Sequence, residues 1–321
     1  VIDATDLAVS PGFINMLSWG YNSLMDDGRA LSDLKQGVTL EIFGEGTSPG
    51  PYWKDGKFTS FGEAMTMLEE KGVSVNIGSF LGAATTRILE VGYKNRQATP
   101  SEMERMRGHV ENSMKEGAMG IGSSLIYAPG DYASTEELTE LSKVASEYGG
   151  MYISHLRSEG TNLLEALEEL ISISRNANIP AEVYHLKASR EPNWSKLDDV
   201  IKRIEEVRKE GLKITADIYT YNASSTGLTG VIPTWVQEGG HRAWINRMKD
   251  PEVRPRLLAD IREQLDEQPP EGILLVGFKT SKMSRKYLAK TVAEAAAMRG
   301  QTPEEAIVDM VIEDDHRIQC I

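Results

Sequence analysis

The segments Met151-Tyr-Ile-Ser-His155 and Ala181-Glu-Val-Tyr-His185 decide the fold prediction, because each is a short apolar run that ends in a histidine. Between them, apolar residues recur at helical spacing from Leu163 to Ile171, and Pro180 closes the helix. The pattern predicts a strand, a helix and a second strand. If these strands are parallel neighbours, both imidazoles lie at the carboxyl edge of the sheet, where α/β proteins place their sites.

The same alternation runs through the first two thirds of the chain. Helices are predicted over residues 61–71, 101–116, 135–148 and 194–209, each opened by a Ser or Thr cap and closed by a glycine. The caps are Ser60, Thr99, Ser134 and Ser195. The predicted strands are Ala8–Leu17, Thr39–Glu45, Val73–Leu81, Ala118–Ile126, Met151–His155, Ala181–His185 and Lys213–Tyr219.

Strands at this spacing fit a closed (β/α)8 barrel or an open doubly wound sheet. No Gly-x-Gly-x-x-Gly turn follows an early strand, which disfavours the dinucleotide-binding alternative. We therefore predict an α/β fold, a (β/α)8 TIM-type barrel over residues 11–321 with an insertion at residues 222–270. The insertion is expected either to cover the barrel mouth as a lid or to lie elsewhere on the surface.

Composition excludes several classes of partner. A net charge of −13 disfavours nucleic acids and anionic membranes, because both require a basic surface, and a small-molecule substrate is expected instead. The single cysteine, Cys320, excludes an internal disulfide and a thiolate cluster. No apolar run is long enough for a membrane span. The compartment stays open, with cytoplasmic as the default, and the oligomeric state is not assigned.

Both ends look cut. The chain opens at Val1 inside an apolar run, and residues 316–321 resemble the opening of a strand. We therefore expect a fragment in which the barrel stops before its last strand.

Three residues are the candidate metal ligands. His155 and His185 end consecutive strands, and neutral imidazoles are common ligands of zinc-like ions. Glu45 ends another predicted strand between Gly44 and Gly46, and the alternative is a solvated turn residue. Glu41 is a weaker rival for the third position.

Other polar residues near the strand ends are candidates for substrate binding. Lys187 shares a face with His185 and suits a carboxylate anchor, a Schiff-base nucleophile or a solvated lysine. Arg157 stands in the same relation to His155, and a structural pairing with Glu159 is the alternative. Tyr219 lies on the next strand, where a phenol can hold a carboxylate or an oxyanion.

Together, these segments resemble the D-aminoacylase (N-acyl-D-amino-acid deacylase) branch of the amidohydrolase superfamily. The residues that carry the resemblance are Val1–Ala4, Val9–Ile14, Gln36–Thr39, Gly44–Gly46, Ile153–Glu159, Tyr184–Lys187 and Asp217–Tyr221. It implies a metal-dependent barrel beside a small β-sandwich, of which residues 1–10 would be a remnant. It also implies zinc ligation by His155 and His185, and a substrate carboxylate held by Lys187, Tyr219 and Ser224.

Two departures from the family pattern limit these expectations. Where the superfamily has Asp-x-His-x-His, this chain has Asn15-Met-Leu17-Ser-Trp19, so we expect one zinc ion and not two. Glu45 falls at or beside the position of a metal-binding cysteine in well-known members. The catalytic acid/base aspartate of the last strand is expected after Ile321.

The resulting prediction is a zinc amidohydrolase that hydrolyses the amide bond of N-acyl-D-amino acids, or of related N-acyl amino acids or peptides, through a metal-activated water. Two alternatives stay open at this point: a Schiff-base aldolase or lyase that uses Lys187, and a degenerate barrel without catalysis. The substrate side chain and the preference for D or L substrates are not predicted.

Overall fold

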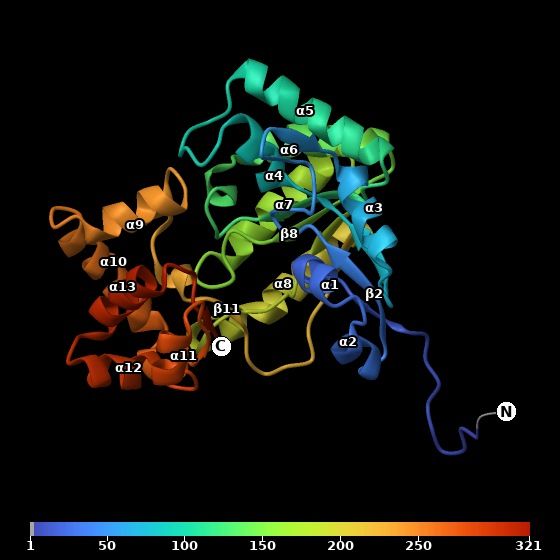
Figure 1. Cartoon of the computed structure of the whole chain (residues 1–321). Helices are drawn as coiled ribbons and strands as arrows, with labels where there is room; N and C mark the ends of the chain where they lie inside the picture. The colour runs from blue at the N-terminus through green and yellow to red at the C-terminus, as the bar shows by residue number, and fades with distance from the viewer. Residues whose placement is uncertain (1–2) are drawn as a thin grey trace.

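The computed structural model describes residues 3–321, and its centre is a parallel array of strands (Figure 1). One sheet has the order β1-β2-β5 and the other β6-β7-β8-β9-β10. Only Phe80 separates β5 from β6, and its N–H donates to the carbonyl of Phe43. The two sheets therefore continue one another, and with β5 and β6 counted as one strand they form seven successive strands. These strands are β1 (Phe13–Asn15), β2 (Val38–Phe43), β5 (Asn76–Ser79), β6 (Leu81–Gly82), β7 (Gly120–Ser124), β8 (Met151–His155), β9 (Ala181–Val183) and β10 (Ile214–Ala216).

Every pairing in this array is parallel, in chain order. All seven predicted strands are present, although most are shorter than the sequence indicated. The first begins at Phe13 and not at Ala8, and residues 3–12 contain no strand. Val1 and Ile2 lie outside the described residues, so the predicted β-sandwich remnant over residues 1–10 stays untested.

Helices cover the outer face of the array and connect its strands. Most of them contribute apolar side chains to the largest core cluster, together with the outward side chains of the strands, whereas Leu24 and Leu68 belong to a separate small cluster. The helices are α1 (Tyr21–Asp26), α2 (Leu31–Lys35), α3 (Phe61–Lys71), α4 (Ala83–Glu90), α5 (Pro100–Lys115), α6 (Thr135–Glu147), α7 (Leu163–Ala177) and α8 (Leu197–Lys209). A smaller cluster packs on the opposite face of the array and consists of Ile42 in β2, Phe80 between β5 and β6, Ile153 in β8 and Tyr184 just after β9.

The predicted helix caps are confirmed at three of four positions. The side chains of Ser60, Thr99 and Ser134 accept the N–H of the third helical residue. Ser195 is wrong as a cap, because it lies inside a short 3-10 helix (Glu191–Lys196), and α8 begins after Lys196 without a side-chain cap.

After β10 the chain leaves the parallel array and forms a helical unit, drawn in orange and red in Figure 1. Its helices are α9 (His241–Lys249), α10 (Arg254–Glu267), α11 (Ser281–Tyr287), α12 (Val292–Arg299) and α13 (Pro303–Asp314). A small antiparallel sheet joins β11 (Thr226–Gly227), β13 (Gln319–Cys320) and β12 (Leu275–Gly277). One apolar cluster runs from Leu228 to Cys320, so the helical unit continues past Pro270.

The helical unit contacts loops that follow the carboxyl ends of the parallel strands. The hydroxyl of Tyr127, after β7, lies 2.6 Å from Oγ1 of Thr226, and Arg190, after β9, pairs with Glu267 at 2.5 Å. This unit therefore borders the edge of the array at which the predicted site lies. Within residues 3–321, none of the helices combines the length and apolar character that a membrane crossing requires.

Helix α8 offers a matched test of the packing. Ile204 is 8% exposed in the largest core cluster, whereas Ile201 is 44% exposed on the same helix. We expect Ile204→Ala to lower the free energy of unfolding by about 2–5 kcal/mol, because it removes buried methyl groups and leaves a cavity. Ile201→Ala should lower it by less than about 1 kcal/mol. Urea unfolding of both variants measures the difference, and equal losses would contradict this packing.

Candidate metal centre

Glu45 lies just beyond the carboxyl end of β2, in a turn that only glycine permits. Gly44 has a φ of 108°, and a Cβ atom there would lie 2.3 Å from the carbonyl oxygen of Phe80. This close approach turns the chain inward, so the Glu45 side chain is buried. Oε2 of Glu45 accepts the indole N–H of Trp19 at 2.7 Å, and Oε1 faces the two histidines.

His155 and His185 lie side by side, as the strand–helix–strand pattern predicted. His155 is the last residue of β8, and His185 follows β9; the ring centroids are 4.5 Å apart at an interplanar angle of 83°. Nδ1 of His155 lies 2.9 Å from Oε1 of Glu45, and Nε2 of His185 lies 3.7 Å from the same oxygen.

The backbone of His185 has a φ of 38°, in the left-handed region that non-glycine residues rarely adopt. Asp217, which follows β10, holds this turn: its Oδ1 accepts the backbone N–H of His185 at 2.7 Å. Burial raises the pKa of Asp217 to about 6. Asp217 therefore supports the loop that presents the imidazole.

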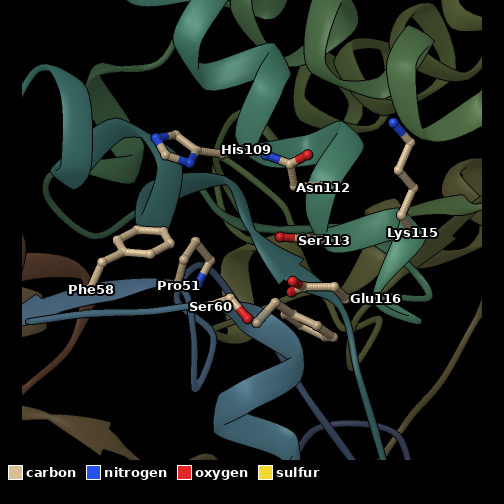
Figure 2. A pocket seen from close by; sticks show the side chains of 9 residues that line it. Pro51, Phe58, Ser60, His109, Asn112, Ser113, Lys115 and Glu116 are labelled. Carbon is tan, nitrogen blue, oxygen red and sulfur yellow. The ribbon is translucent and has the colours of Figure 1, made fainter.

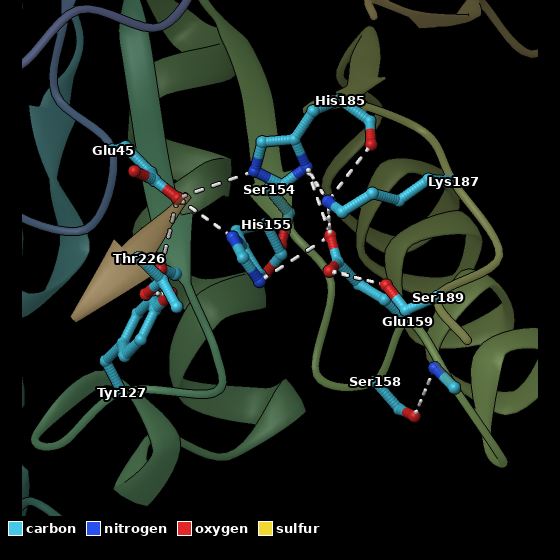
Figure 3. A network of polar contacts seen from close by, with 12 residues as sticks. Glu45, Tyr127, Ser154, His155, Ser158, Glu159, His185, Lys187, Ser189 and Thr226 are labelled. Atoms are coloured by element: carbon cyan, nitrogen blue, oxygen red, sulfur yellow. Dashed lines mark hydrogen bonds and ion pairs between the residues drawn. The ribbon is translucent and has the colours of Figure 1, made fainter. Parts of the chain in front are cut away.

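Glu159 approaches the histidine pair from the side opposite to Glu45 (Figure 3). Its Oε1 lies 3.1 Å from Nδ1 of His185 and 3.6 Å from Nε2 of His155. The same oxygen accepts a hydrogen bond from Nζ of Lys187 at 2.5 Å. The site therefore consists of two imidazoles between two carboxylates, with one ammonium group at the outer edge.

The charges of these groups depend on one another. Burial alone would raise the pKa of Glu45, but hydrogen bonds with His155 and His185 hold it well below its usual range. Burial also opposes ionisation of Glu159, yet the contact with His185 and the nearby cations lower its pKa to about 2. Conversely, burial disfavours the charged form of His185, but both carboxylates raise its pKa to about 9.

Glu45, His155 and His185 fit a zinc-like ion. One ligand atom of each lies within 4.8 Å of the others, and all three side chains are nearly inaccessible to solvent. Two imidazole nitrogens and one carboxylate oxygen are a typical donor set of catalytic zinc, which leaves a fourth position open. A buried carboxylate with a cluster of imidazoles is also expensive without a cation, since each charge needs a partner.

Of the predicted substrate-binding residues, Lys187 and Tyr219 lie at the site. The Tyr219 ring centroid is 6.3 Å from that of His185 and 5.7 Å from Nζ of Lys187. Ser224 lies in the exposed loop after Tyr219. On the other side, the Tyr127 ring is 5.5 Å from the His155 ring.

Arg157 does not face this cluster. Its guanidinium makes two hydrogen bonds with Glu169 on α7, at 2.8 and 2.9 Å, and donates to the carbonyls of Asp131 and Ala133. The structural partner is thus Glu169 and not Glu159, while a role of Arg157 in substrate binding stays a prediction.

The rival ligand Glu41 lies outside the cluster as well. Its side chain is buried inside β2 and accepts a hydrogen bond from Ser18 at 2.7 Å.

A cavity of about 350 Å³ borders Glu45 on the side of Trp19. Aromatic side chains of Trp19, Tyr21 and Tyr52 line it, and Lys54 lies at its edge. In Figure 3 the histidine pair lies between Glu45 and Lys187, and Lys187 is not among the residues that line this cavity.

A second cavity, of about 300 Å³, lies between α3 and α5, away from these groups (Figure 2). Two of its charged or titratable side chains already have partners. His109 pairs with Glu90 at 2.8 Å, and Glu116 accepts the N–H of Gly62 at 2.7 Å. This cavity therefore offers no comparable chemistry.

The sequence did not predict that Glu159 lies at the candidate metal site, or that Trp19 donates a hydrogen bond to Glu45. Glu159 follows His155 by four residues in an irregular loop, where strand periodicity gives no direction for a side chain. An acidic residue shortly after a candidate ligand was the available signal, because histidine ligands commonly donate their second N–H to a carboxylate.

Comparisons with known proteins identify the relatives of this chain. No family model matches it. It is 30% identical over 242 residues to a D-aminoacylase of Alcaligenes xylosoxydans xylosoxydans, covering 71% of this chain and 50% of the relative. An N-acyl-D-glutamate deacylase of the same organism is 27% identical over 241 residues, or 70% of this chain and 49% of that protein. The chain spans about half the length of the curated relatives it matches.

Solved structures show the same fold. The crystal structure of D-aminoacylase that defines a novel subset of amidohydrolases matches with a TM-score of 0.73 at 23% identity, over 97% of this chain and 60% of that one. An N-acyl-D-glutamate deacylase from Bordetella bronchiseptica, complexed with zinc and a phosphonate inhibitor, has a TM-score of 0.76 at 20% identity, with the same coverage.

The chain thus has the fold of the D-aminoacylase subset of amidohydrolases. Its homologues are D-aminoacylase and the N-acyl-D-glutamate and N-acyl-D-aspartate deacylases, which confirms the resemblance inferred from the sequence.

Protons and zinc should compete at His185. Its pKa of about 9 means that the ring carries a proton below that pH, whereas a ligand imidazole must be neutral. We therefore expect the zinc affinity to rise by about tenfold per pH unit from pH 6 to 8 for each proton released. Competition with a chromophoric chelator measures this slope. A His185→Gln variant should bind weakly with a smaller slope, and a pH-independent affinity of the unaltered protein would contradict the expectation.

Proposed function

We propose that this chain carries the metal site of a zinc-dependent deacylase that hydrolyses the amide bond of N-acyl-D-amino acids. The observation that supports this most is the buried group of Glu45, His155 and His185 at the carboxyl ends of parallel strands. The relatives are named for deacylation of N-acyl-D-amino acids, and one related structure holds zinc. Hydrolysis of related N-acyl amino acids or peptides falls within the same chemistry.

The three ligand residues would hold zinc, which when bound lowers the pKa of a coordinated water and polarises the amide carbonyl. Lys187 presents an ammonium group near Tyr219, and together they suit the substrate carboxylate. A substrate with its carboxylate at Lys187 would have its amide at the ligands, and the cavity that borders Glu45 beside Trp19 is the proposed site of the acyl group. Ser224 is a further candidate for the carboxylate.

We propose that the site binds one zinc ion. Leu17 and Trp19 stand on the segment after β1 where histidines would be needed for a second ion. The indole N–H of Trp19 occupies Oε2 of Glu45, so this carboxylate has one oxygen left for a cation.

The proposed architecture is a (β/α)8 barrel, to which the seven parallel strands belong. The sequential parallel order and the apolar cluster on the face opposite the helices support it. The helical unit after Tyr221 would border the mouth of this barrel, which favours the lid over the surface excursion, the two arrangements that the sequence left open for residues 222–270. A general acid/base aspartate on the last barrel strand stays a prediction.

The Schiff-base alternative is less favoured by the environment of Lys187. Its Nζ pairs with Glu159 at 2.5 Å and lies 3.0 Å from Nδ1 of His185, so the nitrogen that would attack a carbonyl is already held by two partners. A degenerate barrel is less favoured because the three ligand side chains remain buried together.

Loss of a ligand should abolish deacylation by the full-length protein. We expect His155→Ala to lower kcat/KM for an N-acetyl-D-amino acid by about 10³-fold or more, equivalent to about 4 kcal/mol of transition-state stabilisation. A chelator should have the same effect on the unaltered protein. Amine release is the measurement, and His109→Ala, which alters a histidine of the second cavity, is the control. Undiminished activity in chelator, with borohydride trapping on Lys187, would instead support the Schiff-base alternative.

The role of Lys187 can be separated from that of the metal. We expect Lys187→Met to raise KM for N-acyl-D-amino acids by about 10- to 100-fold, because a charged hydrogen bond contributes about 1.5–3 kcal/mol. KM should change little for the corresponding carboxamide, which has no carboxylate. The exposed Lys143→Met on α6 is the matched control. An equal effect on both substrates would contradict carboxylate binding by Lys187.

A further inference from the structure

Both rings of the histidine pair lie between Glu45 and Glu159, but only His185 has a close contact with Glu159. Nε2 of His155 makes no hydrogen bond within residues 3–321, while its Nδ1 bonds to Glu45. The inner atoms, Nδ1 of His155 and Nε2 of His185, face Oε1 of Glu45 at 2.9 and 3.7 Å. The outer atoms, Nε2 of His155 and Nδ1 of His185, face Oε1 of Glu159 at 3.6 and 3.1 Å. A single oxygen of Glu159 therefore faces the outer nitrogens of both candidate ligands.

The position of Glu159 is fixed by two loops. Its backbone carbonyl accepts the N–H of Ser189 at 2.7 Å, which ties the loop after β8 to the loop after β9. Its Oε2 accepts a longer hydrogen bond from Oγ of Ser189 at 3.3 Å. The side chain is 15% exposed, so solvent competes little for the carboxylate.

This arrangement matters because a neutral imidazole has one N–H and one lone pair, and a metal ligand must direct the lone pair at the ion. Glu159 only accepts hydrogen bonds, and at His185 it is the nearer carboxylate, 3.1 Å from Nδ1 against 3.7 Å between Glu45 and Nε2. It therefore favours N–H on Nδ1 of His185 and the lone pair on Nε2, whereas at His155 the nearer acceptor is Glu45. Lys187 has the opposite effect: its Nζ lies 3.0 Å from Nδ1 of His185 and can only donate. That contact favours N–H on Nε2, directed at Glu45.

We propose that Glu159 is a positioning residue that sets His185 in the metal-binding tautomer and keeps Lys187 from reversing it. By accepting from Nζ of Lys187 at 2.5 Å, the carboxylate satisfies the ammonium group and remains available to His185. This inference rests on the proposed function, because it assigns the inner nitrogen of His185 to zinc. Glu159 itself lies on the outer side and is outside the ligand group.

The test compares Glu159→Gln with the unaltered full-length protein. A glutamine has nearly the same shape, but its amide can donate to Nδ1 of His185 and so favour the wrong tautomer. We expect the zinc Kd from chelator competition to rise about 10- to 100-fold, as is typical when an outer partner of a histidine ligand is lost. The second readout needs no metal: ¹⁵N shifts of the ring nitrogens, at a pH where the rings are neutral, should report N–H moving from Nδ1 to Nε2 in His185.

Two further variants make the outcome decisive. Glu41→Gln alters a buried carboxylate that contacts Ser18 and not the histidines, and should leave Kd within about twofold. Glu159→Asp keeps the charge and should retain the tautomer with an intermediate Kd, which also covers the case that the glutamine variant does not fold. Zinc affinity and tautomers unchanged in Glu159→Gln, or tautomers reversed in Glu159→Asp, would overturn the proposal. A lack of zinc binding by the unaltered protein would instead refute the proposed function.

Discussion

The rest of the site depends on the burial of two carboxylates, Glu45 and Glu159, against two imidazoles. An ionised carboxylate away from water is costly unless opposite charges and hydrogen bonds compensate for it. Here the compensation comes from His155, His185 and Lys187, which belong to neighbouring loops of the parallel array. The loops must therefore meet at this edge, and the glycine turn at Gly44 and the Asp217 contact are the means by which they do so.

Much of the fold could be predicted from periodicity. Strand–helix alternation indicated each of the seven parallel strands. Three helix caps were confirmed, because a Ser or Thr cap bonds to a backbone N–H only three residues further along the chain. The helical unit after Tyr221 was harder to predict from the sequence. Its order comes from a separate apolar core that joins residues far apart in sequence, from Leu228 to Cys320, and no local pattern indicates such packing.

For the site, sequence reasoning brought together Glu45 and the two histidines, since parallel strands bring their carboxyl ends to one edge. It could not predict the direction of Arg157, whose guanidinium turns toward Glu169 on a helix and not toward the histidines. Glu159 was missed for the same reason. Both side chains lie in the loop after β8, where the backbone follows tertiary contacts and strand alternation no longer applies.

The left-handed backbone of His185 has an implication for selection on this protein. A side chain with a Cβ atom at a φ of 38° carries a conformational penalty of about 1–2 kcal/mol, which glycine at the same position would largely avoid. Selection for folding stability alone would thus favour a residue without an imidazole there. The histidine therefore lowers folding stability at this position, as is expected of a residue that is retained for its chemistry and not for stability.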